Sequence, residues 1–185
     1  MATVSLMSLW LPIVAAAAIV FVASALVWMV LKWHDSDWSK LPDEEAARAA
    51  LTGAAEGEYS VPYAANNAER ASEAFQARCK EGPVVMLTVF PRGLPNMGKQ
   101  LGLWFVYCLL VSWFVAYLLT ATLAAGTNYL QVFQVAGTAA FLAYAGGAVP
   151  AMIWFGQGKG RTVKDIADGL VYALLTAGVF GWLWP

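Results

Sequence analysis

Residues 101–155 have the sequence LGLWFVYCLLVSWFVAYLLTATLAAGTNYLQVFQVAGTAAFLAYAGGAVPAMIWF. They lie inside a longer run, from residue 100 to residue 158, that contains no Asp, Glu, Lys, Arg or His. One helix crosses the bilayer hydrocarbon with about 20 apolar residues, so this run is long enough for two helices. The turn signal Ala125-Gly126-Thr127-Asn128 divides it, and we predict membrane spans at residues 101–124 and 130–155.

Two further apolar segments flank this pair. No charged residue or histidine precedes Lys32, which predicts a first span at about residues 6–31. The last predicted span, residues 166–184, carries one charge, Asp168, in its first turn. Because lipid offers the backbone no hydrogen-bond partners, all four spans are expected to be helices. The predicted fold class is all-α: a single membrane domain, residues 1–185, with four transmembrane helices and a small helical insertion at residues 32–100.

The composition agrees with a membrane protein. Of 185 residues, 60% are hydrophobic and only 12% are charged, and the mean hydropathy is +0.60. An average domain has about twice that share of charged residues. These values exclude a disordered chain and a disulfide scaffold, and a net charge of -1 implies no nucleic-acid partner. The two cysteines, Cys79 and Cys108, are expected to be unpaired packing residues.

The basic residues predict the orientation in the membrane. All 11 Lys and Arg lie on the face that holds residues 32–100 and 156–165. The opposite face holds Ala2, residues 125–129 and the C-terminus, and carries none. By the positive-inside rule the basic face is cytoplasmic, so both termini are expected in the periplasm of a bacterial inner membrane. No basic residue precedes the first span, which favours an uncleaved helix over a signal peptide.

The insertion shows signals for two short helices. A helix is expected from Pro42 to Gly53, and a second from Asn66 or Asn67 through Lys80. Residues 56–63 between them are expected to form a loop. Residues 84–90, VVMLTVF, are too short to span a membrane, and we expect either an extended strand or a segment lying along the interface.

Small residues recur at every fourth position in three of the predicted spans. Such ridges allow helix backbones to approach closely, which drives helix association in lipid. Three ridges exceed what one four-helix bundle needs, so they could serve contacts within the chain, with a partner subunit or with a second copy. The ridges are Cys108, Ser112, Ala116, Thr120 and Ala124; Ala139, Ala143, Gly147 and Ala151; and Gly169, Ala173, Ala177 and Gly181.

The sequence offers little for catalysis or cofactor binding. His34, the only histidine, is expected at a wet helix end just past the first span, and one imidazole without further ligands predicts no metal or haem site. Asp165 is expected to cap the fourth span, with Asp168 reaching back to it as in a capping box. The glycine-rich segment 156–162 lacks a phosphate-loop pattern and is expected to be a flexible turn that touches anionic lipid. No catalytic residue and no cofactor is predicted.

Several motifs along most of the chain are familiar together: KLPDE at 40–44, LTVFP at 87–91, PNMGK at 95–99, LWF at 103–105, FVAYL at 114–118, GTAAFLAY at 137–144, DGL at 168–170 and GWLWP at 181–185. With these motifs the chain resembles a family of short, uncharacterised bacterial four-span inner-membrane proteins. The resemblance implies a bacterial inner-membrane location and no particular activity.

Two functions are compatible with these patterns. The first is a non-enzymatic accessory or scaffold subunit that packs on partner membrane proteins, because the spans carry no deep charge and have surplus ridges. The alternative is a small homo-oligomeric channel or transporter, which needs polar residues on a common axis; Ser112, Thr120, Gln134 and Thr138 are its candidates. The expected partners are membrane lipid and either other membrane subunits or further copies of the chain.

Overall fold

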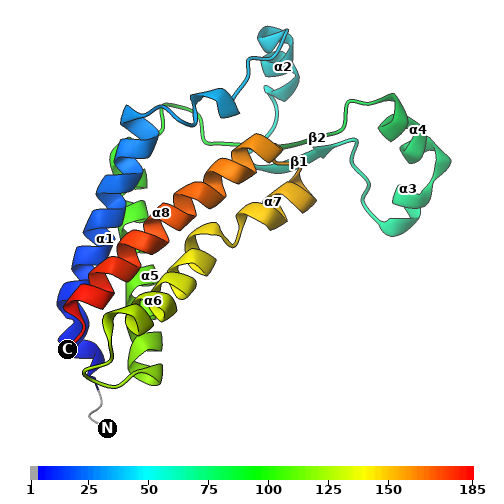
Figure 1. Ribbon diagram of the computed structural model, residues 1–185. Helices are drawn as coiled ribbons and strands as arrows, with labels where there is room; N and C mark the ends of the chain where they lie inside the picture. Colours follow the sequence, from blue (N-terminus) through cyan, green and yellow to red (C-terminus); the bar gives the residue numbers. More distant parts are fainter. Residues whose placement is uncertain (1–3) are drawn as a thin grey trace. The chain divides into compact units, whose positions relative to one another are not determined.

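A computed structural model describes residues 4–185 and divides them into two compact units (Figure 1). The helical unit contains residues 4–39 and 96–185, and the insertion unit contains residues 40–95. Ala2, which the sequence assigns to the same membrane face as Asn128, lies outside the described residues.

The helical unit contains four helices that are long and apolar enough to cross a membrane. The first, Leu6–Val30, starts as a 3-10 turn, continues as α1 (Trp10–Ala25) and ends in a π-helical turn (Leu26–Val30). The second is α5 (Met97–Thr122). The third, Tyr129–Phe155, consists of α6 (Tyr129–Ala145) and α7 (Ala148–Phe155), and the fourth is α8 (Lys159–Leu183). The four predicted spans therefore correspond to four helices, and only the start of the last differs by more than a few residues.

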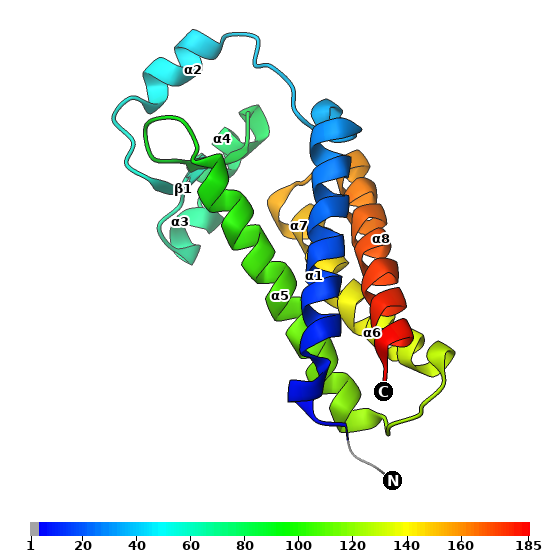
Figure 2. The same ribbon diagram turned by 90° about the vertical axis from the view of Figure 1, so that its left-hand side faces the viewer.

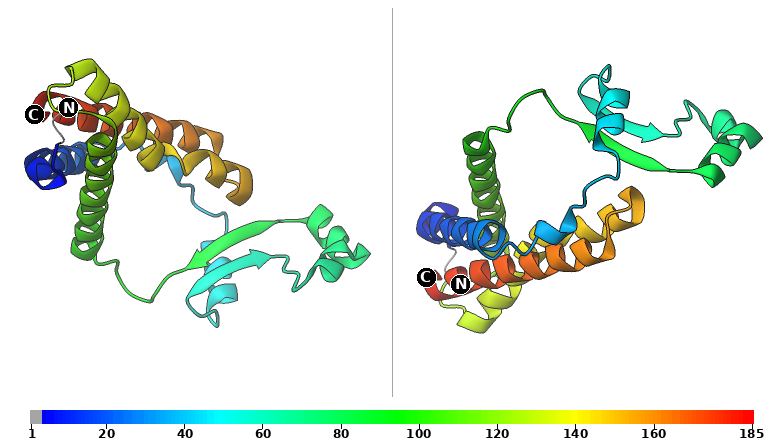
Figure 3. Two further views of the ribbon diagram at one scale, coloured as in Figure 1. Left: turned by 90° about the horizontal axis from the view of Figure 1, so that it is seen from below. Right: turned by 90° about the horizontal axis from the view of Figure 1, so that it is seen from above.

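The core of the helical unit lies where α6 and α8 pack along each other and α1 covers α8 and α5. Small side chains allow this close packing, because Ala136 and Ala140 of α6 and Ala173 and Ala177 of α8 are buried. Phe180 and Leu119 are the larger residues at its centre. The start of α5 diverges from α6 and α7, as Figures 2 and 3 show from two directions.

The fourth helix begins earlier than predicted, at Lys159 instead of residue 166. Asp165 and Asp168 therefore lie inside α8, and the prediction that they cap it is wrong. The charged residues from Lys159 to Asp165 form two further helical turns beyond the apolar segment, so the end of the apolar run does not mark the end of the helix. Only residues 156–158 form the turn between α7 and α8, with Gly156 at φ +69°, so the rest of the predicted flexible segment is helical.

The insertion unit consists of three short helices and one two-stranded sheet. The helices are α2 (Glu44–Leu51), α3 (Asn67–Ala71) and α4 (Glu73–Glu81). Their N-terminal N–H groups donate to the side chains of Asp43, Asn66 and Ser72, respectively. The second predicted helix is thus present but divided, because Ser72 has an extended backbone and caps α4.

Strand β1 (Gly57–Val61) pairs with β2 (Val85–Val89) in a two-stranded antiparallel sheet, with Gly57 opposite Val89 and Val61 opposite Val85. The extended strand is therefore the correct alternative for residues 84–90. The loop expected at residues 56–63 is wrong, and so is a purely helical insertion. Pairing with a strand more than 20 residues away leaves no local signal in the sequence of β1.

Candidate functional site

The chain makes a sharp turn directly after the first candidate span. Lys32 has a left-handed backbone, φ +51°, which is uncommon for a residue other than glycine. A 3-10 turn at Asp35–Asp37 follows. Residues 32–38, which we call the hook, fold back so that His34 reaches α8.

His34 is the centre of a buried ionic network. Its Nε2 lies 2.9 Å from Asp168 Oδ2, and its Nδ1 lies 2.5 Å from Asp37 Oδ2. The Trp28 ring stacks on the imidazole, with centroids 3.9 Å apart and planes 8° from parallel. His34 is only 3% exposed. The expectation that His34 lies at a wet helix end is therefore wrong, because the hook folds it against α8.

The geometry specifies the protons in this network. Ionised carboxylates only accept hydrogen bonds, so His34 completes both contacts only when both of its ring nitrogens carry a proton. Lys164 Nζ donates to Asp37 Oδ1 at 2.6 Å, and this hydrogen bond lowers the pKa of the Asp37 carboxyl below its ordinary value of 3.8. The contacts form one chain from Lys164 through Asp37 and His34 to Asp168.

Lys164 also donates to Ser36 Oγ at 2.8 Å, the spacing of a Ser–Lys nucleophile pair. In such a pair the neutral amine removes the serine proton. Here the Lys164 amine also donates to the Trp33 carbonyl at 2.9 Å and to the Asp37 carboxylate. All three ammonium hydrogens have acceptors, so in this arrangement the amine donates to the serine hydroxyl. The pair is therefore structural and provides no general base.

A cavity of about 600 Å³ opens beside the hook, at the turn between α7 and α8. Arg161 lines it, and its guanidinium carbon lies 5.2 Å from the centre of the Trp38 ring. The nearest carboxylate to its Nε is Asp165 Oδ2 at 3.9 Å, too far for a hydrogen bond. Asp165 instead accepts from Gln157 Nε2 at 2.7 Å. Within residues 4–185 the buried Arg161 Nε donates no hydrogen bond.

Two of the three ridges of small residues lie largely inside the helical unit. On α5, Cys108, Ser112 and Ala116 are buried and Thr120 is half-buried, whereas Ala124 follows the helix. On α8, Gly169, Ala173 and Ala177 are buried and Gly181 is half-buried. The close approach is direct at two glycines: a Cβ added at Gly169 would lie 2.7 Å from Ala145 Cβ, and one at Gly181 2.7 Å from the Tyr129 ring.

The third ridge, which we call the α6–α7 ridge, lies at the edge of the core: Ala139 still packs against the core, whereas Ala143 and Gly147 are turned outward. Ala139 and Ala151 are half-buried, and Ala143 and Gly147 are exposed. The face of α6 that packs in the core is offset by one position, at Val132, Ala136 and Ala140. Ala139 and Ala143 line an open groove of about 420 Å³ between α6 and α5, whose other walls include Tyr107, Leu110, Val111 and Phe114.

The four polar candidates for a channel axis do not share one face. Ser112 is buried, whereas Gln134 and Thr138 are exposed. The hydroxyls of Thr120 and Thr138 donate to carbonyls of their own helices, at 2.8 Å in both cases. Helix-to-helix hydrogen bonds come instead from Trp104 to Ser24 and from Tyr107 to the Ala143 carbonyl.

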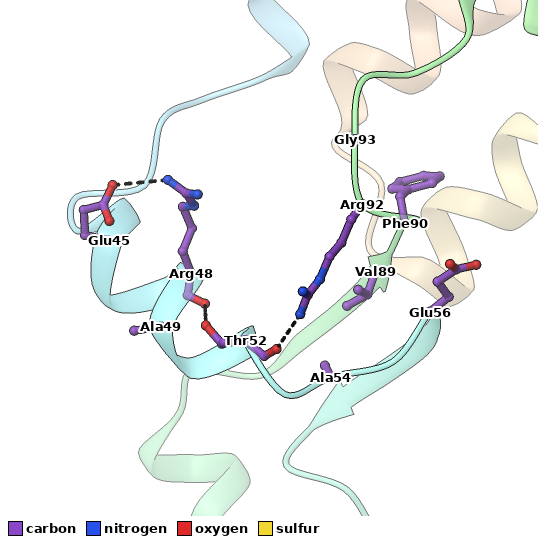
Figure 4. Close-up of a pocket in the computed structure, with 10 residues that line it drawn as sticks. All are labelled: Glu45, Arg48, Ala49, Thr52, Ala54, Glu56, Val89, Phe90, Arg92 and Gly93. Atoms are coloured by element: carbon purple, nitrogen blue, oxygen red, sulfur yellow. Dashed lines mark hydrogen bonds and ion pairs between the residues drawn. The ribbon is translucent and has the colours of Figure 1, made fainter.

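The insertion unit contains a separate pocket of about 880 Å³ between α2 and the two-stranded sheet (Figure 4). Two arginines flank it, but both already have partners: Arg48 lies 3.4 Å from Glu45, and Arg92 donates to the Thr52 carbonyl at 3.3 Å. The lining residues are half-buried or exposed. Nothing in this arrangement selects a ligand.

The sequence did not indicate the contacts between the hook and α8, because residues 127 and 134 positions apart leave no spacing pattern. Among the described residues, no group of three His, Cys, Asp or Glu is arranged to hold a metal ion. No family model, curated protein or solved structure matches the chain. The resemblance to short bacterial four-span membrane proteins therefore stays a prediction.

Proposed function

We propose that this chain is a non-enzymatic integral membrane protein of the bacterial inner membrane that acts as an accessory or scaffold subunit and packs on partner membrane proteins. Its helices cross four times, with both termini in the periplasm and residues 32–100 in the cytoplasm. The observation that carries this proposal is the α6–α7 ridge, where Ala143 and Gly147 are exposed and Ala139 and Ala143 line an open groove.

An outward ridge of small residues supports a contact with another helix. Lipid is as apolar as a leucine side chain, so helices associate in a membrane through close packing and hydrogen bonds. The ridges on α5 and α8 make such contacts within the chain. At Ala143 and Gly147 the same close approach is open to a helix of another protein, which would place its side chains in the groove beside α5.

The ionisable groups support a role without catalysis. Deep charges are the usual sign of a proton or ion path in a membrane protein. Here His34, Asp37, Lys164 and Asp168 neutralise one another at one end of the helices. The dispersed polar residues Ser112, Gln134 and Thr138 likewise favour a partner subunit over a pore made of several copies.

Two variants test this proposal, because the same Ala→Leu substitution is made once on the outward ridge and once on a ridge inside the helical unit. Ala143→Leu adds bulk on the outward ridge and Ala173→Leu adds it inside the helical unit. We expect Ala143→Leu to accumulate and to unfold at the wild-type temperature but to lose its partner in native purification. We expect Ala173→Leu to accumulate poorly, because no hydrophobic gain in lipid offsets the steric loss.

The mass of the natively purified complex measures the outcome. A wild-type complex that contains a foreign membrane protein, and an Ala143→Leu protein without it, is the expected result. A uniform ring of this chain would contradict the accessory role and favour the homo-oligomeric channel. An unchanged complex for Ala143→Leu would show that the outward ridge contacts only lipid.

A further inference from the structure

We propose that the cavity beside the hook binds the phosphate of an anionic lipid headgroup and that Arg161 is the residue that holds it. The inference rests on the proposed membrane insertion, but not on the proposed partner surface.

The first argument is the supply of hydrogen-bond donors. Lys164 lines the cavity, but its three hydrogens are bound by Asp37, Ser36 and the Trp33 carbonyl. Arg161 also lines the cavity; its side chain is 35% exposed, and its Nε donates to nothing within the described residues. The guanidinium therefore keeps donors for the oxygens of a ligand, and a hydrogen bond between two charged groups is stronger than a neutral one.

The second argument is the shape of the guanidinium group and its support. Its planar fork of donors matches two oxygens of a phosphate. The Trp38 ring lies beneath it at 5.2 Å, which limits its orientation. Gln157 binds Asp165 at 2.7 Å and so holds the nearest carboxylate away from the fork. Asp165 stays at ion-pair distance, 3.9 Å from Nε, but accepts no hydrogen bond from Arg161.

The third argument is the space and charge around the fork. Gly160 lines the cavity, and a Cβ added there would meet no atom within 4 Å, so there is room for a ligand. Asp37 also lines the cavity, but its carboxylate faces Lys164 and His34.

The fourth argument is the position relative to the bilayer. The cavity lies at the turn between the third and fourth candidate spans, so it is at headgroup level if these helices cross the membrane. The exposed Phe155 forms an apolar wall beside the polar groups. A lipid offers both an anionic phosphate and apolar carbon next to it, and basic groups at this level attract anionic lipids.

The test measures the unfolding midpoint of the purified full-length protein in neutral detergent during titration with dioctanoyl phosphatidylglycerol. We expect a saturable rise in the wild type and about a tenfold weaker apparent Kd for Arg161→Gln, the size expected for one lost charged hydrogen bond. Arg70→Gln, which changes an exposed arginine of the insertion unit, is the charge-matched control and should bind as the wild type does. Equal binding by the wild type and Arg161→Gln would overturn the proposal.

A second pair of variants avoids removing the arginine. Gly160→Glu places a carboxylate in the cavity, in the first turn of α8 where acidic residues favour the helix, whereas Gly160→Gln has nearly the same volume without the charge. We expect Gly160→Glu to bind phosphatidylglycerol at least tenfold more weakly than Gly160→Gln. Equal affinity of the two variants would overturn the proposal.

Inorganic phosphate and dioctanoyl phosphatidylcholine distinguish the source of the phosphate. Both are expected to bind more weakly than phosphatidylglycerol, since the first lacks the glycerol and acyl contacts and the second is neutral overall. Equal affinity for inorganic phosphate would overturn the lipid as the ligand. The purified chain is measured alone, so loss of a partner subunit does not change this readout.

Discussion

His34 Nε2 lies 2.9 Å from Asp168 Oδ2 and joins residues 134 positions apart, from the hook after the first candidate span and from the middle of α8. This contact joins the hook to α8. Both side chains are almost completely buried, so each depends on the other for its charge balance. Substitutions at either residue are therefore expected to change the stability of the protein.

His34→Ala is expected to destabilise the protein by about 3 kcal/mol, because it leaves the Asp168 carboxylate buried without a partner. In that background Asp168→Asn should recover part of the loss, since it removes the unpaired charge. Thermal unfolding of the two single variants and the double variant gives the coupling energy. Strictly additive effects would argue against a direct pair. Asp35→Asn, an exposed change in the same segment, should stay within about 0.5 kcal/mol of the wild type.

The network also predicts a dependence on pH. The Lys164 hydrogen bond lowers the pKa of Asp37 below 3.8, so this pair stabilises the folded protein above that pH and loses its contribution as the pH falls through the lowered pKa. Unfolding midpoints measured from neutral to strongly acidic pH should therefore fall less for Lys164→Gln than for the wild type. Lys159→Gln is the control and should retain the wild-type acid dependence. Identical acid dependence for Lys164→Gln and the wild type would disprove the assignment.

Two glycines of α8 offer a matched comparison of packing. Gly169→Ala would place a Cβ 2.7 Å from Ala145 Cβ, and such overpacking costs about 1–3 kcal/mol. Gly178→Ala would bring its Cβ no closer than 3.9 Å to Tyr129 Oη, so we expect it to be neutral or slightly stabilising. Chemical denaturation of both variants in the same detergent measures the difference. Equal stability would mean that α8 and the α6–α7 segment are farther apart than this packing requires.

The four candidate spans could be predicted because the chain marks them with charge-free runs, such as residues 100–158. Their ends were less certain, because a helix continues past its apolar segment when charged residues such as Lys159 and Lys164 favour another turn. The small residues of α6 illustrate a second limit. Their spacing identified a ridge, but not that the face offset by one residue, Ala136 and Ala140, enters the core.

The candidate site was largely inaccessible to sequence reasoning. Asp168 is three residues after Asp165, which is the spacing of a capping box. Because this local interpretation accounted for Asp168, the sequence provided no reason to expect its contact with His34. The hook depends on the left-handed backbone conformation of Lys32, which no sequence pattern predicts. Strand β1 was missed for a related reason, since pairing with a strand far along the chain defines it. Local signals predict elements, whereas contacts between distant segments come only from the fold.

The proposed orientation can be tested by cysteine labelling. After Cys79 and Cys108 are replaced, a single cysteine at Asn128 should react with a membrane-impermeant reagent added to intact cells, and one at Ser72 should not. All 11 basic residues lie on the face that carries Ser72, which is why we expect that face inside. Labelling at Ser72 but not at Asn128 would reverse the topology.

The accessory role is tested most directly by site-specific photo-crosslinking in intact membranes. A photoreactive residue at Ala143, on the outward ridge, is compared with one at Leu174, an exposed position of α8. The account predicts that Ala143 crosslinks to one foreign membrane protein of defined mass and that Leu174 crosslinks to no protein. Products only at multiples of the chain's own mass, or no protein product at Ala143, would contradict the proposed partner surface.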